Sequence, residues 1–82
     1  MILKLLGSEI GISTANSFSN TANLIRVINT GAAGVANIAY SNGTVYANVT
    51  IGNTESVIIE KGLTDLIQGT STMKAVPVAY RY

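Results

Sequence analysis

The sequence predicts an all-β fold, a small and mostly antiparallel β-sandwich or flattened barrel of about seven strands. Val, Ile and Thr are frequent, and proline occurs once. Short apolar runs are separated by Asn, Gly and Ser at intervals of roughly 8–12 residues, which is the spacing typical of all-β domains. The chain has 82 residues, which is room for one hydrophobic core, so residues 1–82 are expected to form a single domain.

Seven segments have the composition of strands. They are Ile2–Leu6, Ile10–Ser13, Asn23–Asn29, Val35–Tyr40, Val45–Ile51, Glu55–Lys61 and Lys74–Tyr82. Apolar residues occupy every second position from 45 to 51, so we expect Val49 and Ile51 to face the core. Replacing Val49 with Asp is therefore expected to unfold the domain, because an unpaired charge in a core is costly.

The loops between these segments predict how the strands connect. Asn42-Gly43 tolerates the positive φ angles of a type I′ turn, so residues 35–51 are expected to form a hairpin. The loops Thr30–Gly34 and Gly52–Thr54 are expected to close two more hairpins, which makes the centre of the chain a meander. Two remaining segments are expected to be long surface loops, the second with room for a helical turn at 64–68. They are Thr14–Ala22 and Gly62–Thr72.

Composition limits the chemistry that this chain can perform. It has no Cys and no His, so neither disulfides nor the usual structural zinc site can be built. Nothing in the spacing of the four carboxylates indicates an acid–base pair, and no activated Ser or Thr nucleophile is indicated. We therefore expect neither enzymatic activity nor a cofactor.

Charge and hydropathy point to protein partners. Charged residues make up 11% of the chain, under half of the ~25% found in ordinary soluble domains, while 48% of residues are hydrophobic. Some apolar surface is therefore expected outside the core, although abundant Ser, Thr and Asn offer an alternative source of solubility. The net charge is +1 with scattered Lys and Arg, which disfavours nucleic-acid binding. No apolar stretch is long enough for a signal peptide or a membrane span, and the lack of Cys fits a reducing cytosol.

The carboxyl end is the predicted interface. Pro77 cannot donate a ladder hydrogen bond, so its strand is expected at a sheet edge, or with the proline nitrogen turned away from a neighbouring strand. Tyr and Arg are enriched at interface hot spots, and an exposed edge is a template for pairing. The predicted interface residues are therefore Pro77, Tyr80, Arg81 and Tyr82. In the alternative, this strand closes the fold internally and the tyrosines cap the core.

Four short motifs carry a resemblance to a known group of proteins. They are Arg26-Val27-Ile28-Asn29, the Gly-Ala-Ala loop at 31–33, Glu60-Lys61-x-x-Thr64-Asp65, and Lys74–Tyr80. From about residue 17 onward the chain resembles the short β-sandwich proteins encoded among the structural genes of tailed phages, especially phages of marine bacteria. It departs from their usual form at 61–64, where a proline is expected before Thr64, so the resemblance implies no conformation for that loop.

The resemblance implies a virion structural protein, most concretely a capsid decoration or cement subunit. Such a subunit holds the shell together by contacts with the major capsid protein or other virion proteins. It is expected on the capsid surface of the virion, which is assembled in the host cytoplasm. The subunit itself is expected to form a homo-oligomer. A tail, neck or fibre component is the alternative within this group. A carbohydrate- or host-receptor-binding module that uses the tyrosines is the alternative from a different class.

Overall fold

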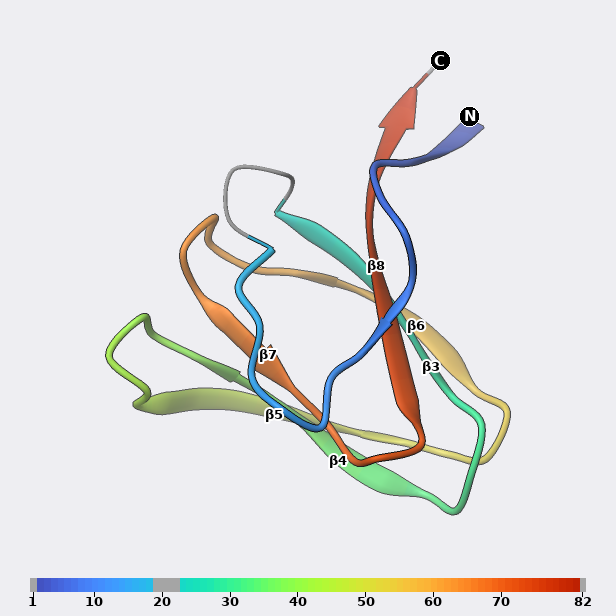
Figure 1. Cartoon of the computed structure of the whole chain (residues 1–82), viewed down its shortest axis with the longest axis vertical. Helices are drawn as coiled ribbons and strands as arrows, with labels where there is room; N and C mark the ends of the chain where they lie inside the picture. The colour runs from blue at the N-terminus through green and yellow to red at the C-terminus, as the bar shows by residue number, and fades with distance from the viewer. Residues whose placement is uncertain (1, 19–22, 82) are drawn as a thin grey trace.

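Two antiparallel β-sheets form the molecule (Figure 1). Its buried apolar side chains come from strands of both sheets. The computed structural model describes residues 2–18 and 23–81. The five-stranded sheet contains β1 (Ile2–Leu5), β2 (Ile10–Gly11), β3 (Leu24–Asn29), β6 (Ser56–Glu60) and β8 (Met73–Arg81). The three-stranded sheet contains β4 (Gly34–Ala39), β5 (Val45–Ile51) and β7 (Leu66–Gln68). The predicted all-β class is confirmed.

All seven predicted strand segments contain a strand, with shifts of a few residues at their ends. The eighth strand, β7, lies inside the segment 62–72 that was expected to be a loop, where residues 64–68 form no helical turn. Its three residues pair with β4, and Ile67 exchanges backbone hydrogen bonds of 2.9 and 3.0 Å with Asn16. Tertiary pairing therefore makes a strand from a segment too short to be recognised by alternation.

The predicted hairpin of residues 35–51 is confirmed. β4 and β5 pair antiparallel from Gly34–Ile51 to Ala39–Val45, and the turn between them has its glycine, Gly43, at a φ of 94°. A register shift between Ile38 and Ala39 places a bulge beside the turn. Strand alternation and the Asn-Gly pair thus predict the hairpin correctly, but the turn is not of type I′. That type needs a positive φ at both central residues, and among Asn42 and Gly43 only the glycine has one. Gly43 N instead donates a 2.8 Å hydrogen bond to the carbonyl of Tyr40.

The expected meander is wrong, because the chain changes sheets on both sides of this hairpin. β3 does not pair with β4; it pairs with β6 along Leu24–Glu60 to Ile28–Ser56. The segments 30–33 and 52–55 are therefore corners at which one long hairpin bends from the five-stranded sheet into the three-stranded sheet. Asn29 ties the corners together with backbone bonds to Glu55 (3.0 Å) and Thr54 (2.8 Å).

Strand β8 lies inside its sheet, so the edge-strand expectation is wrong and the alternative holds, in which the proline nitrogen is turned away from a neighbouring strand, here β3. It pairs with β3 on one side and with β1 and β2 on the other, and β1 runs beside its last residues in Figure 1. The carbonyl of Pro77 accepts a 2.9 Å bond from Leu6 N. Because N and O of one residue point the same way in a strand, the proline nitrogen also faces this side, beside the break between β1 and β2. The break between β1 and β2 therefore accommodates Pro77, which has no N–H group to donate.

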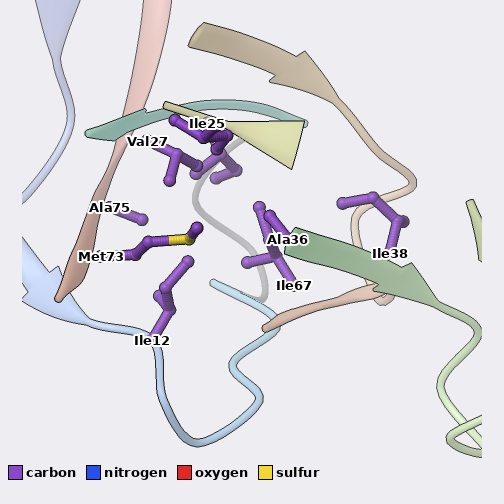
Figure 2. Packing of buried hydrophobic residues seen from close by; sticks show 9 residues of the cluster. Ile12, Ile25, Val27, Ala36, Ile38, Ile67, Met73 and Ala75 are labelled. Atoms are coloured by element: carbon purple, nitrogen blue, oxygen red, sulfur yellow. The ribbon is translucent and has the colours of Figure 1, made fainter. Parts of the chain in front are cut away.

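The core is contributed by both sheets and by the segment after β2. Figure 2 shows the Met73 side chain reaching toward the middle of the cluster, beside Ile12. Both residues are fully buried. A Cβ atom added at Gly69 would lie 2.4 Å from the Met73 sulfur and 3.1 Å from Ile12 Cδ1. The absence of a side chain at Gly69 therefore gives Met73 its place between the sheets.

The two core positions expected on β5 differ in burial. Ile51 is fully buried, as expected, whereas Val49 is 37% exposed. Alternation places both on one face of the strand, but β5 is the last strand of its sheet, and only its final residue, Ile51, belongs to the core cluster. The expectation that Val49 is a core residue is wrong for this reason.

Candidate functional site

The three-stranded sheet carries no charged residue in any of its strands, all of which belong to the described part of the chain. Every residue from 27 to 54 is uncharged, and so are the residues of β7. The five-stranded sheet, by contrast, holds five charged residues, which are Lys4, Arg26, Glu60, Lys74 and Arg81. The surface of this small domain is therefore divided into a charged sheet and an uncharged one, and we call β4, β5 and β7 the uncharged sheet.

The outer face of the uncharged sheet combines amides with an apolar side chain. Asn37 stands in register with Asn48 on one side and with Gln68 on the other. Val35 lies opposite Thr50 on the same face and is 45% exposed. When another protein covers such a face no ion has to be dehydrated, and the amides keep their stability only where the partner offers them hydrogen bonds.

A hollow of about 310 Å³ opens between β5 and β6, the last strands of the two sheets. Its lining is formed by Ile38, residues 46–49 of β5 and residues 57–60 of β6. Val49 and Ile58 are 37% and 40% exposed. Because β5 and β6 separate at the corner 52–55, the two sheets are not closed over the core here. We call this hollow the β5–β6 groove.

An aromatic pair lies at the turn end of the uncharged sheet. The rings of Tyr40 and Tyr46 have centroids 4.5 Å apart and are inclined by 31°, and the two residues are 52% and 43% exposed. The Tyr46 hydroxyl donates a 2.6 Å hydrogen bond to Asp65 Oδ2. This bond to a carboxylate favours the neutral phenol and raises the pKa of Tyr46 to about 12.

The loop that follows β6 is held by a buried lysine. Lys61 is 3% exposed, and its ammonium donates to the carbonyls of Gly62 (3.0 Å) and Leu63 (3.4 Å). Burial lowers the pKa of Lys61, and the negative charge of Asp65 opposes that shift. Asp65 also accepts a 3.1 Å bond from Gly62 N. Within the Glu60-Lys61-x-x-Thr64-Asp65 motif, Lys61 and Asp65 therefore hold the loop that brings Asp65 to Tyr46.

Two further carboxylates, Glu55 and Glu9, make local structural contacts. Glu55 Oε1 accepts a 2.8 Å bond from Gly52 N at a corner, and Glu9 lies 3.9 Å from Arg26 on the five-stranded sheet. No group of three or more acidic residues is placed to hold a metal ion within residues 2–18 and 23–81. In the same residues no helix is long and apolar enough to cross a membrane.

Three of the four residues predicted as an interface, Pro77, Tyr80 and Arg81, belong to β8 of the five-stranded sheet. Pro77 is buried, with its ring beside Gly7. Tyr80 and Arg81 pair through their backbones with Leu3 and Ile2 of β1. Tyr82 lies outside the described residues. A contact role for the end of the chain stays a prediction.

Sequence reasoning did not identify the uncharged sheet and the β5–β6 groove as surfaces. Part of the signal was present, because the charge-free run from 27 to 54 is visible in the sequence. The alternation of β5 was assigned to the core, however, and only the sheet order shows that β5 is an edge strand. Comparisons with protein-family models, with curated proteins and with solved structures found no match to this chain. The proposed function therefore rests on the residues and geometry described above.

Proposed function

We propose that this chain is a non-enzymatic structural subunit of a phage virion, most concretely a capsid decoration or cement protein. The observation that supports this proposal is the uncharged sheet, whose exposed face and edge adjoin an open apolar groove. Charged residues are depleted at the cores of protein interfaces, so a sheet without charge is suited to burial against another protein. The resemblance to short β-sandwich virion proteins directs the proposal to the capsid.

The size of the domain supports the same role. A chain of 82 residues buries only somewhat over ~60% of the surface that its unfolded form exposes. Binding to a shell adds stability, because a partner that binds only the folded state shifts the folding equilibrium toward it. In this proposal the major capsid protein covers the face that contains Val35 and Asn37, and the charged sheet faces solvent.

Quantitative mass spectrometry of purified virions tests the placement. A decoration subunit occurs in a copy number comparable with that of the major capsid protein, whereas a neck, tail or fibre component occurs in far fewer copies. A low copy number would move the chain to the tail or neck. Absence from purified virions would overturn the proposal.

Rebinding to particles that lack the chain tests the surface. Val35→Lys places a charge on the uncharged face, where Val35 is 45% exposed, so the variant should fold and bind particles at least about tenfold more weakly. Ser71→Lys adds the same charge at an exposed turn between β7 and β8, and it should bind as the unmodified chain does. Equal binding by both variants would exclude the uncharged face as the contact.

The tyrosine pair supports a second candidate function, binding of a carbohydrate or host receptor. Tyr40 and Tyr46 expose ring surface beside a carboxylate, and aromatic faces stack on apolar ligand faces. A glycan array tests this function directly. Tight, saturable binding that Tyr46→Ala or Tyr82→Ala abolishes, and that Tyr46→Phe keeps, would favour it over assembly on a capsid.

A further inference from the structure

The outer edge of β5 is a long strand edge without a partner in the described chain. β4 pairs with β5 from Val45 to Ile51 on one side, and no described strand lies on the other side. The backbone N–H and C=O groups that point outward along this edge are therefore available for pairing. Proteins usually protect such an edge with a charged residue, a proline, a bulge or a covering segment.

Edge strands elsewhere in the molecule show this protection. The edge of β7 is covered by Asn16, which exchanges two backbone bonds with Ile67. β1 has only four residues, and one of them is an exposed lysine, Lys4. β6 carries the exposed Glu60. β5 has seven residues with no charge and no proline, and its register shift lies at the end near the turn.

The chemistry of this edge specifies what covers it. A row of unpaired backbone donors and acceptors is satisfied by another extended backbone, that is, by an added strand. In a two-fold antiparallel pair every side chain lies opposite a side chain of the same strand. A charged strand would then face its own charge, whereas β5 presents Val, Tyr, Ala, Asn and Thr to its copy. The net charge of +1 adds little repulsion between whole chains.

We propose that β5 pairs antiparallel with β5 of a second copy of this chain about a two-fold axis. The two uncharged sheets then form one continuous sheet, and the exposed side chains of Val45 and Val49 become partly covered. This proposal rests on the assembly role proposed above, since both use the uncharged sheet. It is tested with the purified chain alone, so its failure leaves the copy number in virions unaffected.

Charge reversal at the middle of the strand tests self-pairing. Asn48 is the middle residue of β5 and is exposed, so a two-fold pair that uses most of the strand brings the two copies of residue 48 opposite or nearly opposite each other. We expect the unmodified chain to dimerise in sedimentation equilibrium. Asn48→Lys and Asn48→Glu should each weaken dimerisation at least about tenfold, because like charges meet.

An equimolar mixture of the two variants distinguishes a second copy from any other occupant. Mixing should restore the dimer, and native mass spectrometry should show the mixed species as the dominant one. Ser71→Lys, which adds a charge away from the edge, should dimerise as the unmodified chain does. A mixture that dimerises no better than either variant alone would overturn the proposal, as would an unmodified chain that stays monomeric at every concentration.

Hydrogen exchange of the unmodified chain provides a test that does not depend on the variants. The outward-pointing amides of residues 46–50 should be protected at concentrations where the chain is dimeric and should lose protection on dilution, while the core strand β3 keeps its protection. Protection of β5 that does not change with concentration in a dimeric sample would place the dimer contact elsewhere and overturn the proposal.

Discussion

The side-chain amide of Asn29 donates a 2.9 Å hydrogen bond to the backbone carbonyl of Ile51, which joins the last residue of β3 to the last residue of β5 across the corner between the sheets. The same amide donates to Ala32 O at 2.9 Å. Its Oδ1 atom accepts bonds from Gly31 N (3.0 Å) and from the Thr72 hydroxyl (2.7 Å). Asn29 is fully buried and has both donors and its acceptor satisfied.

Replacing Asn29 should therefore be costly. Asn29→Ala leaves up to four polar groups without their partner, and each unsatisfied buried group costs about 1–3 kcal/mol, so a loss of at least about 2 kcal/mol in the free energy of unfolding is expected. Asn53→Ala is the matched control, because Asn53 is exposed in the adjacent corner, and it should change stability by less than about 0.5 kcal/mol. Urea denaturation measures both. Equal stability of the two variants would show that the corner does not depend on Asn29.

Ile51 and Val49 differ in burial, so substitutions at these two positions of β5 should differ in their effect on stability. Ile51→Ala should reduce stability by about 2–5 kcal/mol, because Ile51 is fully buried and its truncation leaves a cavity. Val49→Asp should remain folded, since Val49 is 37% exposed and the new carboxylate can stay in water. Thermal melting of both variants by circular dichroism checks this. Unfolding of Val49→Asp would return Val49 to the core.

Close packing at Gly69 predicts a penalty for the smallest added side chain. Gly69→Ala places a methyl group 2.4 Å from the Met73 sulfur and 3.2 Å from Met73 Cβ, and overpacking of a core typically costs about 1–3 kcal/mol. Gly11→Ala is the control, because nothing lies within 4 Å of its added Cβ. In a double-mutant cycle with Met73→Ala, the penalty of Gly69→Ala should shrink. An unchanged penalty would place its origin in the backbone.

The hydrogen bond between Tyr46 and Asp65 predicts that the Tyr46 phenol ionises at a higher pH than a free tyrosine. The pKa of Tyr46 is raised to about 12 from 10.0, chiefly by the hydrogen bond to Asp65. The folded-state pKa lies above the unfolded one, so the contribution of this bond to stability is complete below pH 10 and is lost as the pH rises through about 12. Absorbance titration at alkaline pH should show a step near pH 12 that is absent from Tyr46→Phe.

Two further variants assign that step. Asp65→Asn removes the negative acceptor and should move the ionisation of Tyr46 toward 10, whereas Tyr40→Phe should leave the step near pH 12 in place. A step that persists in Tyr46→Phe belongs to another tyrosine and would contradict the assignment.

A contact role for the end of the chain can be tested without unfolding the protein. The buried residues Ala75, Val76 and Val78 precede Arg81 in β8, so deletion of residues 81–82 should leave a folded domain. If the terminus is a contact, the truncated chain should bind particles more weakly. Arg81→Ala/Tyr82→Ala keeps the backbone that pairs with Ile2 and should show the same loss. A truncated chain that binds as the full chain does would show that the terminus takes no part.

The fold class, seven of the strand segments and the β4–β5 hairpin are predictable from the amino-acid sequence alone. These features depend on local signals, namely the alternation of 45–51 and the Asn-Gly pair at 42–43. Strand period and turn chemistry act over a few residues, and they are read without knowledge of the rest of the chain.

The tertiary structure decided which sheet each strand joins, and with it the candidate site. Alternation shows that Val49 and Ile51 share a face, but it does not show that β5 ends its sheet and leaves Val49 exposed. Likewise, Pro77 was compatible with an edge strand or with an inner strand whose proline nitrogen is turned away from a neighbour, and only the break between β1 and β2 shows that the second applies. Strand order is set by pairing between segments far apart in the sequence, because a strand can satisfy its backbone with many partners and only packing of the whole core selects among them.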